Sequence, residues 1–153
     1  MRCPFTALQT VDLCDKYAWS LVTAQVPYLW GGDTPLSGLD CSGSVIWILQ
    51  GVGLFPHGQD ANADSLMRKY TRVTEPLRGC LACFGDATKG VATHIAWVTA
   101  VVDESVYILE AGGGGSKDLT RADAIRDHAE MRMRKVGGPG CRTDLLCYVD
   151  PFV

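Results

Sequence analysis

Long apolar runs are absent from this sequence of 153 residues. No segment approaches the roughly 20 apolar residues that a membrane-spanning helix needs, so we expect no insertion into a membrane. The first residues also lack a basic stretch followed by an apolar one, and a standard cleavable signal peptide is therefore not expected. The protein is expected in the cytoplasm of the cell that makes it, unless another route carries it across a membrane.

An excess of positive charge is absent as well. Lysine and arginine number 14 against 17 aspartates and glutamates, which gives a net charge of -3 and an isoelectric point near 5.5. A nucleic acid is therefore not an expected partner. The one small basic cluster, Arg132, Arg134 and Lys135, is interpreted as the solvated face of a strand. Repeats, low-complexity tracts and linkers are also lacking, and the length is typical of a single domain over residues 1–153.

Cysteine is plentiful, but its number and spacing favour free thiols. The seven cysteines are an odd number, so they cannot all pair within one chain. Without an export signal, reduced thiols are expected. Cys80 and Cys83 form a C-x-x-C pair, yet a structural zinc site needs a second such pair or histidines nearby in sequence. We therefore expect no metal or cofactor, and we expect small core residues at four of the cysteines: Cys14, Cys80, Cys83 and Cys147.

The first third of the chain predicts two helices separated by a loop. Residues 6–24 carry apolar side chains at helical spacing, with Thr6 as the expected cap and Pro27 beyond the end. A loop rich in glycine and proline follows over residues 27–38. A largely apolar helix is expected to start at Asp40 or Cys41 and to be buried.

The rest of the chain reads mainly as strands. Two short helices are expected over residues 61–70 and 120–129, the second capped by Thr120. Five short strands are expected within residues 77–85, 92–102, 105–113, 131–137 and 145–152. Helices first and strands afterwards predict an α+β fold, with the N-terminal helices packed on a central antiparallel sheet.

Cys41 is the first candidate for chemistry. It follows the glycine-rich loop and opens the buried helix, whose positive end stabilises a thiolate. The thiolate is the reactive form of cysteine, so this position favours a nucleophile. Gly43 keeps the first turn free of a side chain, and we expect a substrate backbone to approach there. Taken alone, the residue is better explained as a buried structural cysteine.

His94 and Glu110 are the candidate partners of Cys41. His94 lies within an apolar strand, where a histidine needs a polar partner, and together with an activatable cysteine it predicts a Cys–His pair. Glu110 ends the next strand and is the candidate that orients the imidazole. A two-residue hairpin loop would place His94 and Glu110 on opposite faces. The assignment therefore predicts a three-residue loop, or an equivalent bulge, that makes them diagonal neighbours with Ala96 opposite Glu110.

Several segments resemble motifs of NlpC/P60 cell-wall peptidases, which have a papain-like fold. The sequences V-P-Y-L-W-G-G (26–32) and L-D-C-S-G (39–43) resemble the opening motif of that family. T-H-I-A-W-V (93–98) resembles its histidine strand, and I-L-E-A (108–111) resembles the segment that carries the third catalytic residue. The stretch 131–152 resembles the C-terminal strands of phage-encoded members. The third residue of the family is commonly a second histidine, whereas this sequence has Glu110.

The resemblance implies a cysteine peptidase that cuts peptide stems of peptidoglycan between D-γ-glutamate and a diamino acid. Cys41 would form the acyl-enzyme, and His94 would protonate the leaving amine. The Cys41 N–H and the Tyr28 hydroxyl would stabilise the oxyanion. Asp40 and Ser42 match positions that face the substrate in relatives. Trp30 is expected to pack beneath the site.

The same resemblance implies a phage endolysin or tail-associated lysin, which stays cytoplasmic until release or travels with the virion to the cell wall. Two alternatives remain open at this point. One is an amidase or acyltransferase of the same superfamily that acts on a small-molecule or lipid amide through a long apolar groove. The other is a non-catalytic wall-binding or structural protein. His57 and His128 fit no catalytic pattern and are expected at the surface.

Overall fold

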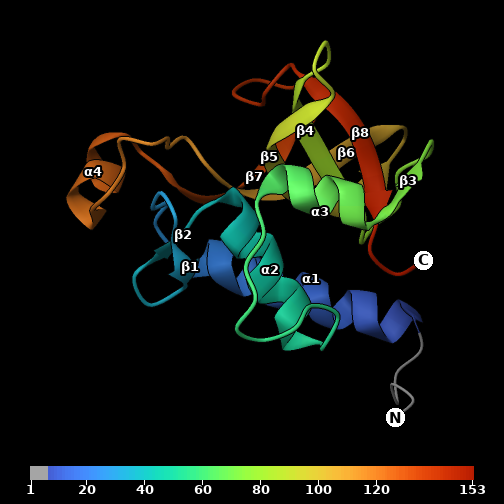
Figure 1. The fold of residues 1–153 in the computed structure, drawn as a ribbon, viewed down its shortest axis with the longest axis horizontal. Coiled ribbons are helices and arrows are strands. Elements are labelled where there is room, and N and C mark those ends of the chain that lie inside the picture. Colours follow the sequence, from blue (N-terminus) through green and yellow to red (C-terminus); the bar gives the residue numbers. More distant parts are fainter. Residues whose placement is uncertain (1–6) are drawn as a thin grey trace.

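The computed structural model describes residues 7–153 and has the expected order of helices followed by strands (Figure 1). The helices are α1 (Ala7–Thr23), α2 (Cys41–Gly51), α3 (Ala63–Lys69) and α4 (Arg121–Arg126). The longer strands are β4 (Leu81–Asp86), β5 (Val91–Val102), β6 (Ser105–Gly112), β7 (Glu130–Lys135) and β8 (Leu145–Asp150). The predicted cap Thr6 lies outside the described residues. No helix within residues 7–153 is long and apolar enough to cross a membrane.

Three short strands were not predicted from the sequence. β1 (Asp33–Thr34) and β2 (Gly38–Leu39) pair as a small separate hairpin in the loop before α2. β3 (Thr71–Val73) pairs with β8 at the edge of the main sheet. Strands of two or three residues show too little alternation of apolar and polar side chains to stand out in a sequence.

The main sheet has six antiparallel strands in the order β3-β8-β4-β5-β6-β7. In Figure 1, α1 and α2 lie together below the sheet, α3 lies across it, and α4 stands apart on the left. This is the predicted α+β arrangement of N-terminal helices on an antiparallel sheet. It places the start of α2, with Cys41, beside the central strands.

The sheet has apolar clusters on both of its faces. One face packs against the helices, with Ile95, Trp97 and Leu109 among its buried side chains. The other face carries a second cluster of buried residues, Cys80, Ala82, Phe84, Ala96, Val98, Val106 and Ile108. His94 and Glu110 belong to this second face by strand alternation. Both are therefore polar groups inserted into an apolar layer.

The β5–β6 hairpin has a two-residue loop and one bulge. Val102 pairs with Ser105, so Asp103 and Glu104 form the turn, and both have positive φ, 47° and 61°, as a type I′ turn requires. The register then shifts between Val98 and Ala100. The predicted three-residue loop is wrong, but the equivalent bulge is present at Thr99. A bulge adds one residue to one strand. Relative to the partner strand, every residue of that strand beyond the bulge therefore points to the other face of the sheet.

Candidate active site

The start of α2 is built around Asp40 and three glycines. Asp40 caps the helix: its Oδ1 accepts hydrogen bonds from the Gly43 N–H (2.7 Å) and from the Ser42 hydroxyl (3.1 Å), and its Oδ2 accepts one from the Gly31 N–H (3.1 Å). A Cβ atom on Gly43 would lie 2.2 Å from the carbonyl oxygen of Gly32. The expected role of Gly43 in admitting a substrate backbone is therefore wrong, because the glycine admits the preceding loop instead.

These contacts fix the position of Cys41 as the first residue of α2. Its side chain is partly exposed, and it is a free thiol like the other five cysteines of residues 7–153. The first N–H groups of a helix have no acceptor within the helix. The backbone N–H of Cys41 therefore has no acceptor within the helix and lies at the positive end of the helix.

His94 lies between Cys41 and Glu110. Its Nε2 atom is 2.7 Å from Oε2 of Glu110, and the Cys41 thiol is close enough to raise the pKa of His94. The exposed fractions of His94 and Glu110 are 7% and 5%. The structure thus brings together the three residues expected as nucleophile, base and orienting group.

The electrostatics of His94 favour its charged form. Burial lowers the pKa of His94, but the hydrogen bonds and negative charges of Cys41 and Glu110 outweigh burial and raise the pKa to about 9. At neutral pH the imidazole is then protonated. An imidazolium next to Cys41 stabilises the thiolate, which is the nucleophilic form.

The three residues open into a cleft of about 790 Å³. Its walls combine polar side chains with bare backbone, and they include Tyr28, Trp30, Asp40, Ser42, Asn62, Asp64, Thr93, Gly112 to Gly115 and Arg142. Burial raises the pKa of Tyr28 far above its ordinary value, so the phenol stays neutral and can donate a hydrogen bond. Trp30 is 56% exposed and lines the cleft, so the expectation that it packs beneath the site is wrong.

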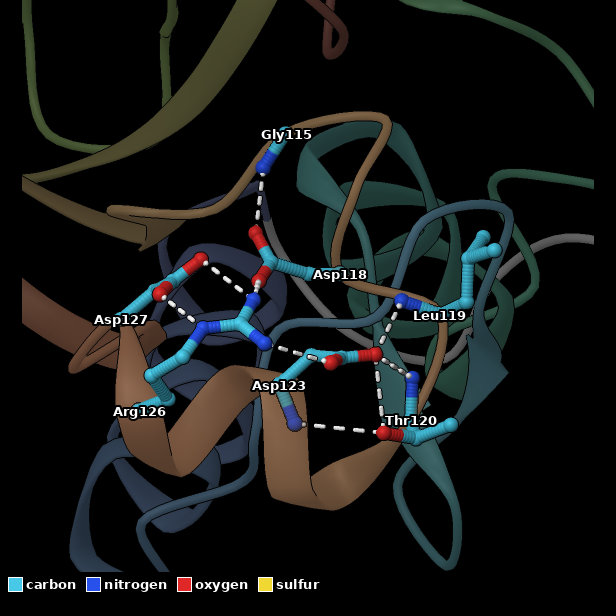
Figure 2. Close-up of polar contacts among 7 residues, drawn as sticks. All are labelled: Gly115, Asp118, Leu119, Thr120, Asp123, Arg126 and Asp127. Atoms are coloured by element: carbon cyan, nitrogen blue, oxygen red, sulfur yellow. Dashed lines mark hydrogen bonds and ion pairs between the residues drawn. The ribbon is translucent and has the colours of Figure 1, made fainter.

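One wall of the cleft is a run of glycines that a polar network holds in place (Figure 2). Asp118, with 2% exposure, accepts a hydrogen bond from the Gly115 N–H at 2.7 Å, and its backbone carbonyl accepts one from the Trp30 N–H at 2.8 Å. Arg126 of α4 lies among three carboxylates, 2.7 Å from Asp127, 2.9 Å from Asp123 and 3.8 Å from Asp118. The predicted cap Thr120 forms a capping box with Asp123, which anchors α4.

The family model described as the CHAP domain matches residues 14–112, which is well over half of the chain. The chain belongs to the CHAP family. The matched residues contain Cys41, His94 and Glu110. No curated protein matches this CHAP chain.

Solved structures similar to the CHAP chain include NlpC/P60 proteins. An NlpC/P60 family protein from Bacillus cereus ATCC 10987 has a TM-score of 0.71 and 18% identity, over 99% of this chain and 42% of that chain. The NlpC/p60 domain of the peptidoglycan hydrolase SagA has a TM-score of 0.62 and 18% identity, over 92% of this chain and 97% of that chain. The structure of Ly7917 with the hydrolyzing product of MDP has a TM-score of 0.56 and 15% identity, over 92% of this chain and 62% of that chain. The CHAP chain spans less than half of the Bacillus cereus protein. The similarity of these structures confirms the predicted NlpC/P60 fold.

Three arginines near the CHAP site were missed or misread from the sequence. Arg132 and Arg134 are only partly exposed: β7 places them on the same face as Glu110, with Arg132 directly opposite it. Arg142 lines the cleft and donates a hydrogen bond to the Thr93 hydroxyl at 3.0 Å. The alternation of Arg132 and Arg134 along one strand was a visible signal, but the sequence did not show which strand lies next to Glu110.

The remaining predictions concern residues away from the CHAP site. His57 and His128 are exposed, as expected. Cys14, Cys80 and Cys83 are buried, whereas Cys147 is only partly buried and packs at the edge of the core. Within residues 7–153, no group of three or more His, Cys, Asp or Glu residues is arranged to hold a metal ion.

Proposed function

We propose that this CHAP domain hydrolyses an amide bond in the peptide stem of bacterial peptidoglycan, between D-γ-glutamate and the diamino acid that follows. The observation that carries the proposal is the contact series from Cys41 through His94 to Glu110, opening into a cleft large enough for a short peptide. Support for the substrate comes from the relatives: one is a domain of a peptidoglycan hydrolase, and another is described with the hydrolyzing product of MDP.

The reaction follows from the positions of the three residues. The Cys41 thiolate attacks the carbonyl carbon, and a C–S bond forms while the carbonyl oxygen takes the negative charge. The Cys41 N–H and the neutral Tyr28 hydroxyl are the donors proposed for that oxyanion. The C–N bond then breaks as the His94 imidazolium gives its proton to the leaving amine. Neutral His94 next takes a proton from water, which hydrolyses the thioester and frees Cys41.

The cleft offers polar groups for the rest of a stem peptide. Ser42 donates its hydroxyl proton to Asp40, and both residues line the cleft close to Cys41. We propose that this pair accepts hydrogen bonds from the free amino terminus of the stem peptide. The glycine wall presents backbone groups with no side chain in front of them, which suits an extended peptide backbone.

The lipid amidase or acyltransferase alternative needs a long apolar groove, whereas the cleft beside Cys41 also carries polar residues such as Asp40, Ser42 and Arg142. We propose a role as a phage endolysin or tail-associated lysin, because residues 131–152 resemble the C-terminal strands of phage-encoded members.

Mass spectrometry of purified muropeptides tests the proposal. Wild type is expected to release a fragment that ends at D-glutamate and a fragment that begins with the diamino acid, and Cys41→Ala is expected to release neither. If folded wild-type protein leaves every muropeptide intact, the proposed substrate is wrong. Cleavage at another amide of the stem would keep the reaction and overturn the bond.

A further inference from the structure

Two arginines of β7 lie beside the carboxylate that contacts His94. In the antiparallel β6–β7 pair, Arg132 is directly opposite Glu110, and Arg134 is opposite Ile108. Residues two apart on a strand share a face, so both guanidinium groups are on the side of Glu110. The Nε atom of Arg134 is 4.0 Å from Oε1 of Glu110, while Oε2 of Glu110 contacts His94. The two oxygens of one carboxylate therefore face two different cations.

Both arginines are partly exposed, but part of each guanidinium group is held away from solvent. Nε and Nη2 of Arg132 and Nε of Arg134 are buried and have no hydrogen-bond partner among residues 7–153. Close backbone covers them: a Cβ atom on Gly113 would lie 1.8 Å from Nη2 of Arg132, and one on Gly140 would lie 2.7 Å from Nη1 of Arg134. Burial and the charge of Arg134 lower the pKa of Arg132, whereas Glu110 and Glu130 oppose that change.

Charged nitrogen atoms that are shielded from solvent are costly unless an anion compensates them. The carboxylate nearest to Arg134 is Glu110, which is itself 5% exposed. A carboxyl group buried this deeply without a cation tends to become protonated, because burial disfavours its charged form. A neutral Glu110 could not stabilise the imidazolium of His94. The ionisation of Glu110 and the shielding of these arginine nitrogen atoms therefore support each other.

We propose that Arg134, assisted by Arg132, is a positioning residue that keeps Glu110 ionised and so maintains the Cys41–His94 ion pair. The inference rests on the proposed Cys41–His94–Glu110 site. Neither arginine touches the nucleophile in this account, and each acts through Glu110. The titratable and charged groups near Glu110 come from α2, β5, β7 and the segment before β8: Cys41, His94, Arg132, Arg134, Cys141 and Arg142.

The rate at which iodoacetamide alkylates Cys41, measured across pH, tests this role without any peptidoglycan substrate. Peptide mass spectrometry isolates the signal, because Cys41 is the only cysteine in the tryptic peptide 17–68. In Arg134→Met, Glu110 takes up a proton at higher pH than in wild type, and the ion pair is lost with it. In a plot of the Cys41 alkylation rate against pH, we expect the midpoint of the acidic limb to rise by about 1 pH unit, which is typical for the loss of one nearby opposite charge.

Three further variants separate this role from a structural one. Arg134→Lys keeps the charge and is expected to restore the wild-type midpoint. Lys135→Met removes the same charge from the next residue of β7, which points to the other face, and is expected to leave the midpoint unchanged. The double variant that combines Glu110→Gln with Arg134→Met is expected to have the same midpoint as Glu110→Gln alone. If Arg134→Met does not fold, Arg134→Gln takes its place, because it removes the charge but keeps a hydrogen-bond donor.

The outcomes are distinct. If Cys41 in wild type reacts no faster than an ordinary thiol at neutral pH, the proposed catalytic site is wrong. If wild-type Cys41 is reactive and the midpoint in folded Arg134→Met or Arg134→Gln matches that of wild type, the catalytic site stands and the role of Arg134 is overturned. A midpoint that shifts equally in Lys135→Met would also overturn it, because the effect would then be one of net charge alone.

Discussion

His94 and Glu110 are held 2.7 Å apart across a hairpin whose turn alone would place them on opposite faces of the sheet. The turn residues Asp103 and Glu104 set Val102 opposite Ser105. The extra residue Thr99 then shifts the pairing by one, and beyond it even-numbered residues of β5 share a face with even-numbered residues of β6. The catalytic pairing proposed here therefore depends on one bulge.

The bulge is anchored to α1. The Thr99 hydroxyl donates a hydrogen bond to Oδ1 of Asp15 at 2.7 Å, and it accepts one from the Trp19 indole at 2.9 Å. The Trp97 indole also donates to Oδ1 of Asp15, at 2.9 Å. A helix that follows the N-terminus thus fixes the register of a hairpin in the second half of the chain.

Deletion of Thr99 is predicted to abolish activity by returning His94 and Glu110 to opposite faces. A glycine inserted between Asp103 and Glu104 gives the three-residue loop that corrects the register without a bulge. We expect the deletion combined with this insertion to regain activity, although both proteins lose the contacts to Asp15. Equal loss of activity in the two proteins, both folded, would show that the register is not the reason.

Removal of the base is predicted to cost more than removal of the orienting group. His94→Ala loses the proton transfers and is expected to lower kcat by about 10² to 10⁴. Glu110→Gln loses one charge-assisted hydrogen bond and is expected to lower kcat by roughly 10- to 100-fold. Steady-state kinetics on a muropeptide measure both. Glu110→Gln with wild-type activity would remove Glu110 from the site.

The raised pKa of His94 predicts an alkaline limit for both activity and stability. The pKa is about 9 in the folded protein against an ordinary 6.5, so the protonated form stabilises the fold fully below 6.5, and this contribution is lost as pH rises through about 9. We expect kcat/KM and the melting temperature to fall together near pH 9. In His94→Ala the melting temperature should lack this decline, whereas the exposed-histidine control His57→Ala should keep it.

Asp118 is predicted to support the glycine wall of the cleft. Asp118→Ala removes the acceptor of the Gly115 N–H and is expected to cost about 1.5 to 3 kcal/mol of unfolding free energy. Because the wall binds substrate and performs no chemistry, KM should rise more than kcat falls. Asp127→Ala is the matched control, since Asp127 also pairs with Arg126 but has no contact with Gly115 in Figure 2. A larger rise of KM in Asp127→Ala would contradict the account.

Much of the fold could be predicted from local patterns. The helical spacing before Pro27, the cap at Thr120 and the alternation in β5 and β6 gave the main elements, because each is encoded within about ten residues. The pairing of His94 with Glu110 could also be predicted, since the chemistry required them on one face. Whether a longer loop or a bulge met that requirement depended on contacts of Thr99 with α1, which local sequence does not show.

The errors share one cause, which is that neighbours distant in sequence decide the role of a residue. Arg132 and Arg134 were assigned to solvent, yet pairing of β7 with β6 places them beside Glu110 and buries Nε and Nη2 of Arg132 and Nε of Arg134. Gly43 was assigned to substrate, yet it faces the backbone of Gly32. Trp30 was assigned to packing, yet it is exposed in the cleft.

Covalent capture of the acyl-enzyme tests the central claim most directly. Wild type mixed with a muropeptide, quenched in acid and digested, should show the tryptic peptide 17–68 increased in mass by the acyl portion of the stem that ends at D-glutamate. Cys41→Ala should fold with a melting temperature close to that of wild type and show no adduct, while Cys147→Ala should form the adduct as wild type does. Turnover by wild type with the adduct on any other residue, or turnover by Cys41→Ala, would contradict the assignment of Cys41 as the nucleophile.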